Sequence, residues 1–261
     1  IDSLESKKKK GNIFEALTKY YLLLNPIYKI QLKNVWMHYE VPNDVKTYIN
    51  FPNTDEGIDL VAKTYDGKYW AIQCKYLGNQ ESSINGKYIS SFLDLSTNVC
   101  KNIDLMLTIT TANNKSYKFD QKYDNKVLFI LGDVWNTLDE DFFLKLHEYL
   151  ENNRIEYKPF TPKPHQERAI KNAYSHFIEE DSNRGKLIMA CGSGKSLTAF
   201  WITKELKANK IIIAVPSLAL IKQTLDVWTR ESLANNLDIN WIVVCSDESV
   251  AKKDEDIFTS S

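Results

Sequence analysis

The sequence of 261 residues is 43% hydrophobic, which is enough apolar material for the cores of one large domain or two ordinary ones. Its 33 lysine and arginine residues nearly balance its 34 aspartate and glutamate residues, so a nucleic-acid surface must be a local patch rather than a general positive field. The 4 cysteines are widely spaced, which argues against a disulfide framework and a cysteine-rich zinc site. No apolar run is long enough to span a bilayer, which argues against a membrane segment. Together these features predict a soluble protein of the reducing cytoplasm.

The first part of the chain predicts a mixed α/β domain with a small sheet. Apolar residues at helical spacing predict a helix over 11–26, which ends at Asn25-Pro26. One or two strands are expected over 28–41, and two strands around a tight turn over 55–76. The later elements are a loop and helix over 82–100, strands over 104–112 and 126–133, and an amphipathic helix over 139–151.

The predicted hairpin over 55–76 contains polar residues inside apolar strands. Gln73 and Lys75 are two residues apart, so both side chains project from one face of their strand. Asp59 lies among apolar neighbours in the other strand, where a carboxylate is costly unless a metal ion or Lys75 meets it. A two-residue turn would point Asp59 away from Gln73, whereas a loop over 65–67 with Gly67 left-handed in a bulge places the two opposite each other. We predict the bulged turn, and an ordinary exposed hairpin is the alternative for this pattern alone.

A polar, proline-containing stretch over 152–166 marks a domain boundary. We therefore expect a first domain over 1–152, a linker over 153–164 and a second domain over 165–261. Helices and strands alternate in the second domain, which predicts a parallel, doubly wound sheet. Helices are expected over 166–180, 195–207 and 217–231, and strands over 186–190, 210–216 and 240–246.

The stretch LIMACGSGKSLTAF is the most specific signal in the chain, because an apolar strand leads into glycines and then into Lys195 and Ser196 at a helix start. This order is typical of a P-loop, in which backbone N–H groups and the helix N-terminus hold phosphates. The expected nucleotide-binding residues are Gly192, Ser193, Gly194, Lys195 and Ser196. Lys195 would reach the β and γ oxygens, and the Ser196 hydroxyl would hold Mg²⁺ with the nucleotide. Met189 occupies the first glycine position of the general pattern, and a glycine-rich turn without a ligand is the alternative.

This form of the loop resembles superfamily 2 helicases and translocases, in which a residue other than glycine is common at that first position. KPHQERAI is similar to the upstream glutamine motif of the family, which implies that Gln166 contacts the adenine of ATP; a glutamine that merely starts a helix is the alternative. VPSLALIKQT resembles the motif that contacts DNA after the second strand, which implies DNA contacts by Pro216, Ser217 and Gln223; a plain crossover helix is the alternative. VVCSDE is similar to a segment of the translocases of some restriction systems.

The same resemblance implies that the RecA-like domain is incomplete in this chain. No acidic Walker B box follows Lys195, and SDES at 246–249 does not replace it. The second RecA-like domain, with its arginine finger, is also missing. The expectation is weak nucleotide binding, if any, and no translocation by this chain alone.

GIDL followed by IQCKY resembles the Mrr-like branch of the PD-(D/E)xK nucleases, in which a glutamine replaces the acid of the third motif. The resemblance implies that Asp59 is the metal-binding carboxylate, Gln73 a polar metal ligand and Lys75 the catalytic lysine. Glu15 matches the helix glutamate of that family, and a solvated helix glutamate is the alternative. Phosphodiester hydrolysis needs a hard cation with oxygen ligands, and Asp59, the Gln73 amide oxygen and the Cys74 carbonyl would bind Mg²⁺. Lys75 would stabilise charge on the pentavalent phosphorus or orient the water.

The order of Mrr-like nuclease, short linker and superfamily 2 motor resembles the N-terminal part of Type ISP restriction-modification enzymes. The expected fold is a restriction-endonuclease-like mixed-sheet α/β domain followed by an incomplete RecA-like parallel α/β domain. The resemblance implies an Mg²⁺-dependent endonuclease coupled to an ATP-driven translocase on double-stranded DNA, with further helicase, methyltransferase and target-recognition domains on the same polypeptide. Two alternatives remain: a helicase-nuclease of defence or repair without a methyltransferase, and a motor whose N-terminal domain only binds DNA.

Overall fold

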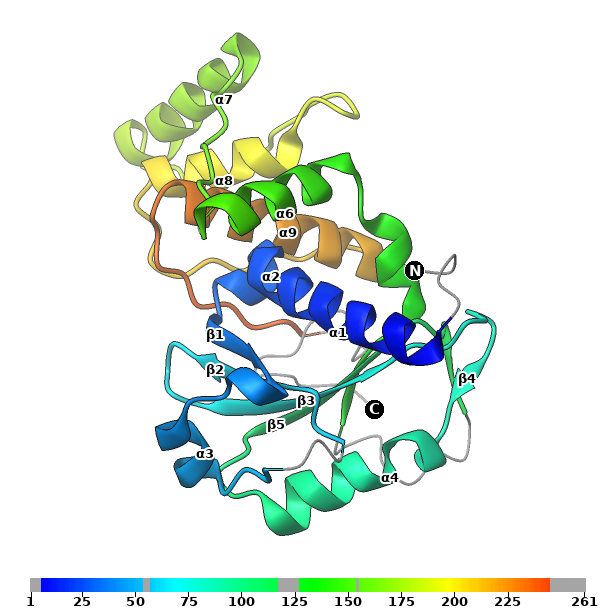
Figure 1. Ribbon diagram of the computed structural model, residues 1–261. Coiled ribbons are helices and arrows are strands. Elements are labelled where there is room, and N and C mark those ends of the chain that lie inside the picture. Colours follow the sequence, from blue (N-terminus) through cyan, green and yellow to red (C-terminus); the bar gives the residue numbers. More distant parts are fainter. Residues whose placement is uncertain (1–5, 54–56, 117–126, 154, 245–261) are drawn as a thin grey trace. The chain divides into compact units, whose positions relative to one another are not determined.

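The computed structural model describes residues 6–53, 57–116, 127–153 and 155–244, which fall into two units (Figure 1). Described residues up to 155, together with 242–244, form the first unit, and residues 156–241 form the second. Residues 156–164, which the sequence predicts as linker, are grouped with the second unit. The domain boundaries themselves stay predictions.

The first unit is built on a mixed five-stranded sheet of order β1-β2-β3-β5-β7. Its strands are β1 (Leu32–Met37), β2 (Leu60–Thr64), β3 (Tyr69–Lys75), β5 (Leu105–Thr110) and β7 (Leu128–Ile130). The pairs β1/β2 and β2/β3 are antiparallel, and β3/β5 and β5/β7 are parallel. The mixed α/β sheet predicted for this part of the chain is therefore confirmed.

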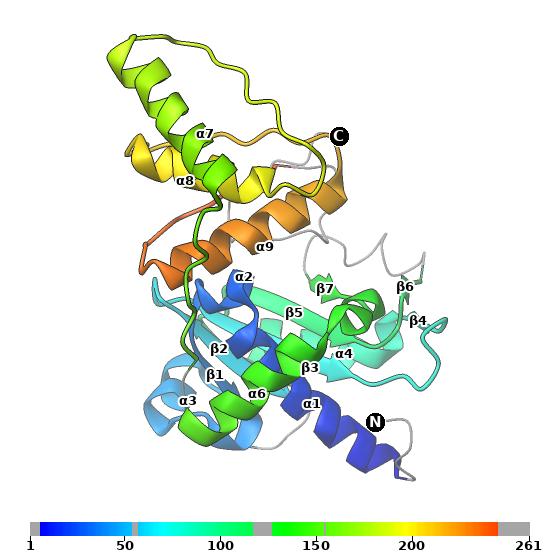
Figure 2. The ribbon, with the colours of Figure 1, turned by 90° about the horizontal axis from the view of Figure 1, so that it is seen from above.

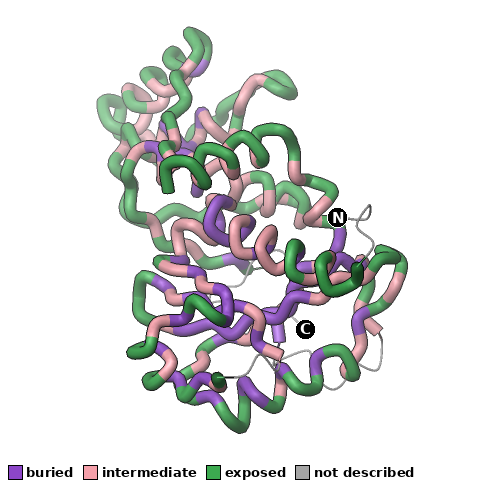
Figure 3. Tube along the Cα trace, in the orientation of Figure 1, coloured by how far each residue is buried: buried purple, intermediate pink, exposed green. Residues whose placement is uncertain are grey.

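Helices lie on both faces of this sheet in Figure 1, and Figure 2 looks down on one of these faces. The remaining elements of the unit are α1 (Lys7–Leu24), α2 (Pro26–Lys29), α3 (Asn43–Ile49), β4 (Ser83–Ile84), α4 (Gly86–Asp94), β6 (Asn114–Lys115) and α6 (Glu140–Asn152). Helix α1 packs on β1 and β3, with Phe14 buried against Ile72, while Phe92 of α4 is buried with Ala71 on the other face. Buried residues concentrate in the strands and in α1, as Figure 3 shows.

The β2/β3 hairpin has the bulged turn that the sequence predicts. Leu60 pairs with Ile72 and Lys63 with Tyr69, which leaves a three-residue loop over 65–67 between Thr64 and Lys68. Gly67 has a φ of 90°, a backbone conformation that glycine adopts without the steric cost of a Cβ. The bulged turn and the register from Leu60 to Lys63 are confirmed, and the face on which the Asp59 side chain lies stays a prediction.

The sequence reading missed α3, a helix of 7 residues. It starts after Pro42 and ends at Asn50, which adopts the left-handed conformation with a φ of 48°. Only Val45 and Ile49 are buried on it. Two apolar positions in two turns are too few for a periodicity argument to separate a short helix from a loop.

The second unit contains α7 (Pro164–Tyr174), α8 (Lys195–Glu205) and α9 (Leu218–Ala234), with α8 in contact with both of the other helices. The predicted strands over 186–190 and 210–216, and the described part of 240–246, have no strand pairing. Most of their apolar side chains are open to solvent, with Ile188 80% and Ile212 97% exposed, although Val243 is buried. The prediction of paired strands is wrong for these described residues. A parallel strand needs hydrogen-bonded neighbours, and apolar composition does not supply them.

None of the helices in the described part of the chain has both the length and the apolarity needed to cross a bilayer. The segments VVCSDE and SDES include residues from 245 onward, and these lie outside the described residues.

Candidate active site and phosphate loop

The hairpin brings Asp59 to the end of β3 that carries Gln73 and Lys75. Asp59 directly precedes β2, and its backbone N–H donates to the Ile72 carbonyl at 3.0 Å. The β2/β3 pairing ends at Leu60 opposite Ile72, and Asp59 and Gln73 are the next residues on the two strands. Lys75, two residues after Gln73, ends β3 on the same face of that strand as Gln73.

The Gln73 amide is fully buried and has a free acceptor. Its Nε2 donates to the Gly57 carbonyl oxygen at 3.1 Å, and this contact fixes which end of the amide is the nitrogen. Its Oε1 has no hydrogen-bond partner, and neither does the buried Oγ1 of Thr108, the residue paired with Gln73 on β5. A buried carbonyl-type oxygen without a donor is costly, and a hard cation is a partner that would satisfy it.

Asp59 is fixed to the strand that carries the other two residues. Its Oδ2 accepts the backbone N–H of Cys74 at 2.5 Å, and the carboxylate is half-buried. Burial, and then the charge of Asp59, raise the pKa of the Cys74 thiol well above its ordinary value. The thiol therefore stays neutral, which leaves the backbone carbonyl as the group that Cys74 could offer to a hard cation.

Glu15 lies on α1, the helix that packs on the opposite face of β3. Its charge nevertheless adds to the rise in the pKa of Cys74, while the charge of Lys75 opposes that rise. The charges of Glu15 and Lys75 thus both influence the pKa of Cys74, near the end of β3. Within the described ranges, no three His, Cys, Asp or Glu side chains form a metal-binding cluster, so a cation here would depend on amide and carbonyl oxygens besides the carboxylates.

The predicted phosphate loop has the backbone that such a loop requires. Gly192 has a φ of 73° and Gly194 a φ of 82°, and both conformations favour glycine. Gly194 is the N-cap residue of α8, so Lys195 and Ser196 open this helix. The Lys195 ammonium donates to the Ala190 carbonyl at 3.1 Å and so closes the loop on itself.

Gln166, on α7, forms hydrogen bonds to the backbone of this loop. It is only 4% exposed, and its Nε2 donates to the carbonyls of Ser193 at 3.1 Å and Gly194 at 3.4 Å. Its Oε1 accepts the Lys163 N–H at 2.8 Å. The predicted contact with adenine would have to replace some of these bonds, and it stays a prediction.

A cleft of about 1130 Å³ lies between α7 and the loop. Its lining includes His165, Arg168, Asn172, Met189, Ala190 and Ser193. The cleft adjoins the glycines of the loop, and its walls combine apolar and polar side chains, as small-molecule sites commonly do.

The residues predicted to contact DNA lie at the start of α9. Pro216, Ser217 and Gln223 are all exposed, so a duplex could reach them. The Ser217 hydroxyl oxygen accepts the Leu220 N–H at 3.4 Å and caps the helix. These residues belong to the second unit, whereas the candidate nuclease residues belong to the first.

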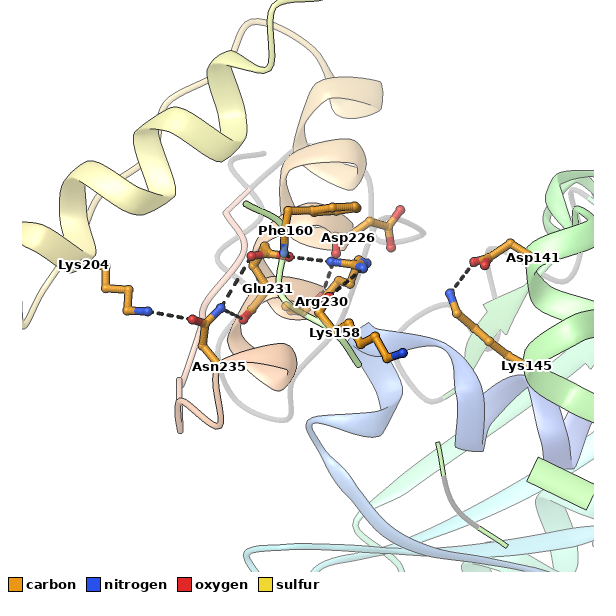
Figure 4. A network of polar contacts seen from close by, with 10 residues as sticks. Asp141, Lys145, Lys158, Phe160, Lys204, Asp226, Arg230, Glu231 and Asn235 are labelled. Carbon is orange, nitrogen blue, oxygen red and sulfur yellow. Dashed lines mark hydrogen bonds and ion pairs between the residues drawn. The ribbon is translucent and has the colours of Figure 1, made fainter. Parts of the chain in front are cut away.

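The sequence analysis missed a polar network on the second half of α9 (Figure 4). Glu231 is fully buried, forms an ion pair with Arg230, and accepts the backbone N–H of Phe160 at 3.2 Å. Arg230 also donates to the Lys158 carbonyl at 3.1 Å and lies 3.7 Å from the centroid of the Phe160 ring. The adjacent Arg-Glu pair in the sequence gives no sign of burial, so only the fold identifies it.

Two parts of the chain match known protein families. Residues 23–135 match the family described as "Restriction endonuclease" (Mrr_cat_2), and residues 159–260 match "Type III restriction enzyme, res subunit" (ResIII). The chain joins a restriction endonuclease domain to a restriction helicase domain. Asp59, Gln73 and Lys75 lie inside the endonuclease match, and Glu15 lies before it.

A solved structure resembles nearly the whole of this nuclease-helicase chain. The "ATP-dependent Type ISP restriction-modification enzyme LlaBIII bound to DNA" superposes with a TM-score of 0.68 at 26% sequence identity. The match covers 97% of the present chain but only 16% of that enzyme's chain. A search of curated protein sequences gives no significant match.

Proposed function

We propose that this chain contains the nuclease and the first part of the motor of a restriction-modification enzyme that cleaves double-stranded DNA with Mg²⁺ and moves along it with ATP. The observation that supports the proposal is the arrangement at the end of β3, where the partnerless Gln73 oxygen lies one residue from Cys74, whose N–H bonds to Asp59, and two residues from Lys75. The likeness to a DNA-bound Type ISP enzyme supports the choice of DNA as substrate.

In this proposal, Asp59, the Gln73 amide oxygen and the Cys74 carbonyl hold Mg²⁺, with Glu15 as a further carboxylate. Bound by these residues, Mg²⁺ would supply a Lewis acid for the scissile phosphate and hydroxide near neutral pH. Lys75, partly buried at the end of β3, would neutralise the charge that develops on the phosphate oxygens. The Asp59 carboxylate is oriented in advance because one of its oxygens is already bound to the backbone.

The motor half of the proposal assigns the phosphates of ATP to Gly192, Ser193, Gly194 and Lys195. Ser196 would hold the Mg²⁺ that accompanies the nucleotide, and Gln166 would contact adenine. Pro216, Ser217 and Gln223 would contact the DNA backbone. Further helicase, methyltransferase and target-recognition domains of the same polypeptide, acting in the cytoplasm, would complete the enzyme.

A second candidate function is DNA binding without cleavage by the first domain. The observation in its favour is that position 73 holds an amide and not a carboxylate. Cleavage of plasmid DNA by the intact protein, with Mg²⁺ or Mn²⁺ and ATP, separates the two. Loss of metal-dependent cleavage in both Asp59→Ala and Lys75→Ala supports the nuclease, whereas cleavage that persists in both variants, or is absent from the wild type under every metal, rejects it.

A further inference from the structure

Trp228 of α9 makes a contact with the phosphate loop that the motifs do not account for. Its indole Nε1–H donates to the Ser196 hydroxyl oxygen at 3.2 Å. Ser196 is in the first turn of α8, and Trp228 is held in place by an edge-on contact with Phe200 of the same helix, with ring centroids 5.3 Å apart. The donor and the acceptor therefore come from two helices that pack on each other.

The chemistry of this bond suits a hydroxyl that binds a cation. The Ser196 oxygen has two lone pairs, and the Trp228 N–H occupies one of them. The other lone pair remains for a metal ion, and the hydroxyl rotor is restrained because an indole can only donate. Groups that orient a metal ligand in this way commonly affect metal affinity nearly as strongly as the ligand itself.

We propose that Trp228 is a positioning residue for the Mg²⁺-nucleotide complex: it orients the Ser196 hydroxyl toward the metal. The inference rests on the proposed ATP site. Helix α9 would then have two roles. It starts at the residues proposed to contact DNA, and ten residues after Leu218 it carries the Trp228 indole that orients the proposed metal ligand.

The test is the affinity of the intact protein for ADP, measured by calorimetry with Mg²⁺ and again with EDTA. Trp228→Phe keeps an aromatic ring against Phe200 and removes the N–H donor. We expect this variant to lose on the order of tenfold in Mg²⁺-ADP affinity and to bind metal-free ADP as the wild type does. Trp201→Phe, which alters a buried indole on α8 itself, is the matched control and should retain the wild-type Mg²⁺-ADP affinity.

A double-mutant cycle with Ser196→Ala separates positioning from packing. If Trp228 acts through the hydroxyl, Trp228→Phe has no further effect on Mg²⁺-ADP affinity once Ser196 is alanine. Equal Mg²⁺-ADP affinity in the wild type and Trp228→Phe, or an equal loss with and without metal, overturns the inference. Lys195→Ala tests the proposed site separately, because wild-type binding that is no tighter than that of Lys195→Ala rejects the nucleotide site and the inference with it.

Discussion

Asp59 and Cys74 are joined by a short hydrogen bond in which the Asp59 carboxylate accepts the Cys74 backbone N–H at 2.5 Å. The bond links the residue before β2 to the strand that carries Gln73 and Lys75, so the proposed catalytic groups share one rigid support. Preorganised groups of this kind need little rearrangement in the transition state, which is where much of the rate enhancement of an enzyme arises.

Asp59→Asn should abolish cleavage while leaving the fold intact. The asparagine oxygen can still accept the Cys74 N–H, but the negative charge for the cation is lost, and we expect plasmid cleavage to fall on the order of 100-fold. Asp104→Asn is the matched control, because the Asp104 carboxylate also accepts a β3 backbone N–H, that of Tyr69 at 2.8 Å, at the other end of the strand. Full activity in Asp59→Asn, or an equal loss in both variants, would contradict the assignment.

Gln73→Glu should make the thermal stability of the first domain more dependent on metal. Without a cation, the buried carboxylate loses the Nε2 bond to Gly57 and places an unpaired charge in the core, so the melting temperature should fall. With Mg²⁺ the added charge gains a partner, and the increase in melting temperature should exceed that of the wild type. Thermal unfolding with EDTA and with Mg²⁺ measures both effects. A metal-induced increase no larger than that of the wild type would argue against a cation at Gln73.

Glu231→Ala should release the chain around Phe160 from α9. It removes the acceptor of the Phe160 N–H and leaves Arg230 without its buried partner, and breaking such a pair costs about 3–5 kcal/mol of unfolding free energy. Hydrogen exchange of the Phe160 amide should accelerate. Lys145→Ala removes an exposed ion pair with Asp141 and serves as the control, with an expected cost of about 0–1 kcal/mol. Unchanged protection of the Phe160 amide in Glu231→Ala would refute the role of this carboxylate.

His176 should stabilise the second unit more at low pH than at high pH. Its bond to the Arg184 carbonyl and its bond to Glu180 raise the pKa of the imidazole above its ordinary value of 6.5. The stabilisation is then complete below that value and is lost as the pH rises through the higher pKa of the folded state. Thermal melts of the wild type and His176→Gln across this range should differ most at low pH and converge at high pH. A difference that does not depend on pH would show that the ring acts by packing alone.

The nuclease hairpin could be predicted because its evidence is local. The alternation of side chains and the need for a left-handed glycine fix the register between β2 and β3, and both follow from adjacent residues. The same holds for the phosphate loop, where the order of glycines, Lys195 and Ser196 specifies the turn and the helix start.

The parts that could not be predicted depend on contacts between distant segments. Periodicity does not reveal that Gln166 holds the loop carbonyls or that Glu231 is buried, because each needs a partner many residues away. The wrong strand predictions have the same origin. The apolar run around Ile212 has the composition of a strand, but pairing is a property of two segments and not of one.

The bonds between Gln166 and the phosphate loop would compete with the adenine contact proposed for Gln166. An adenine that engages the Gln166 amide must draw it away from the Ser193 and Gly194 carbonyls, so base recognition and loop release become a single event. A nucleotide with a base other than adenine could still place its phosphates in the loop, but the Gln166 bonds to the Ser193 and Gly194 carbonyls would stay in place. The proposed nucleotide site would then discriminate between nucleotides in the step that frees the loop, even where their phosphates bind equally well.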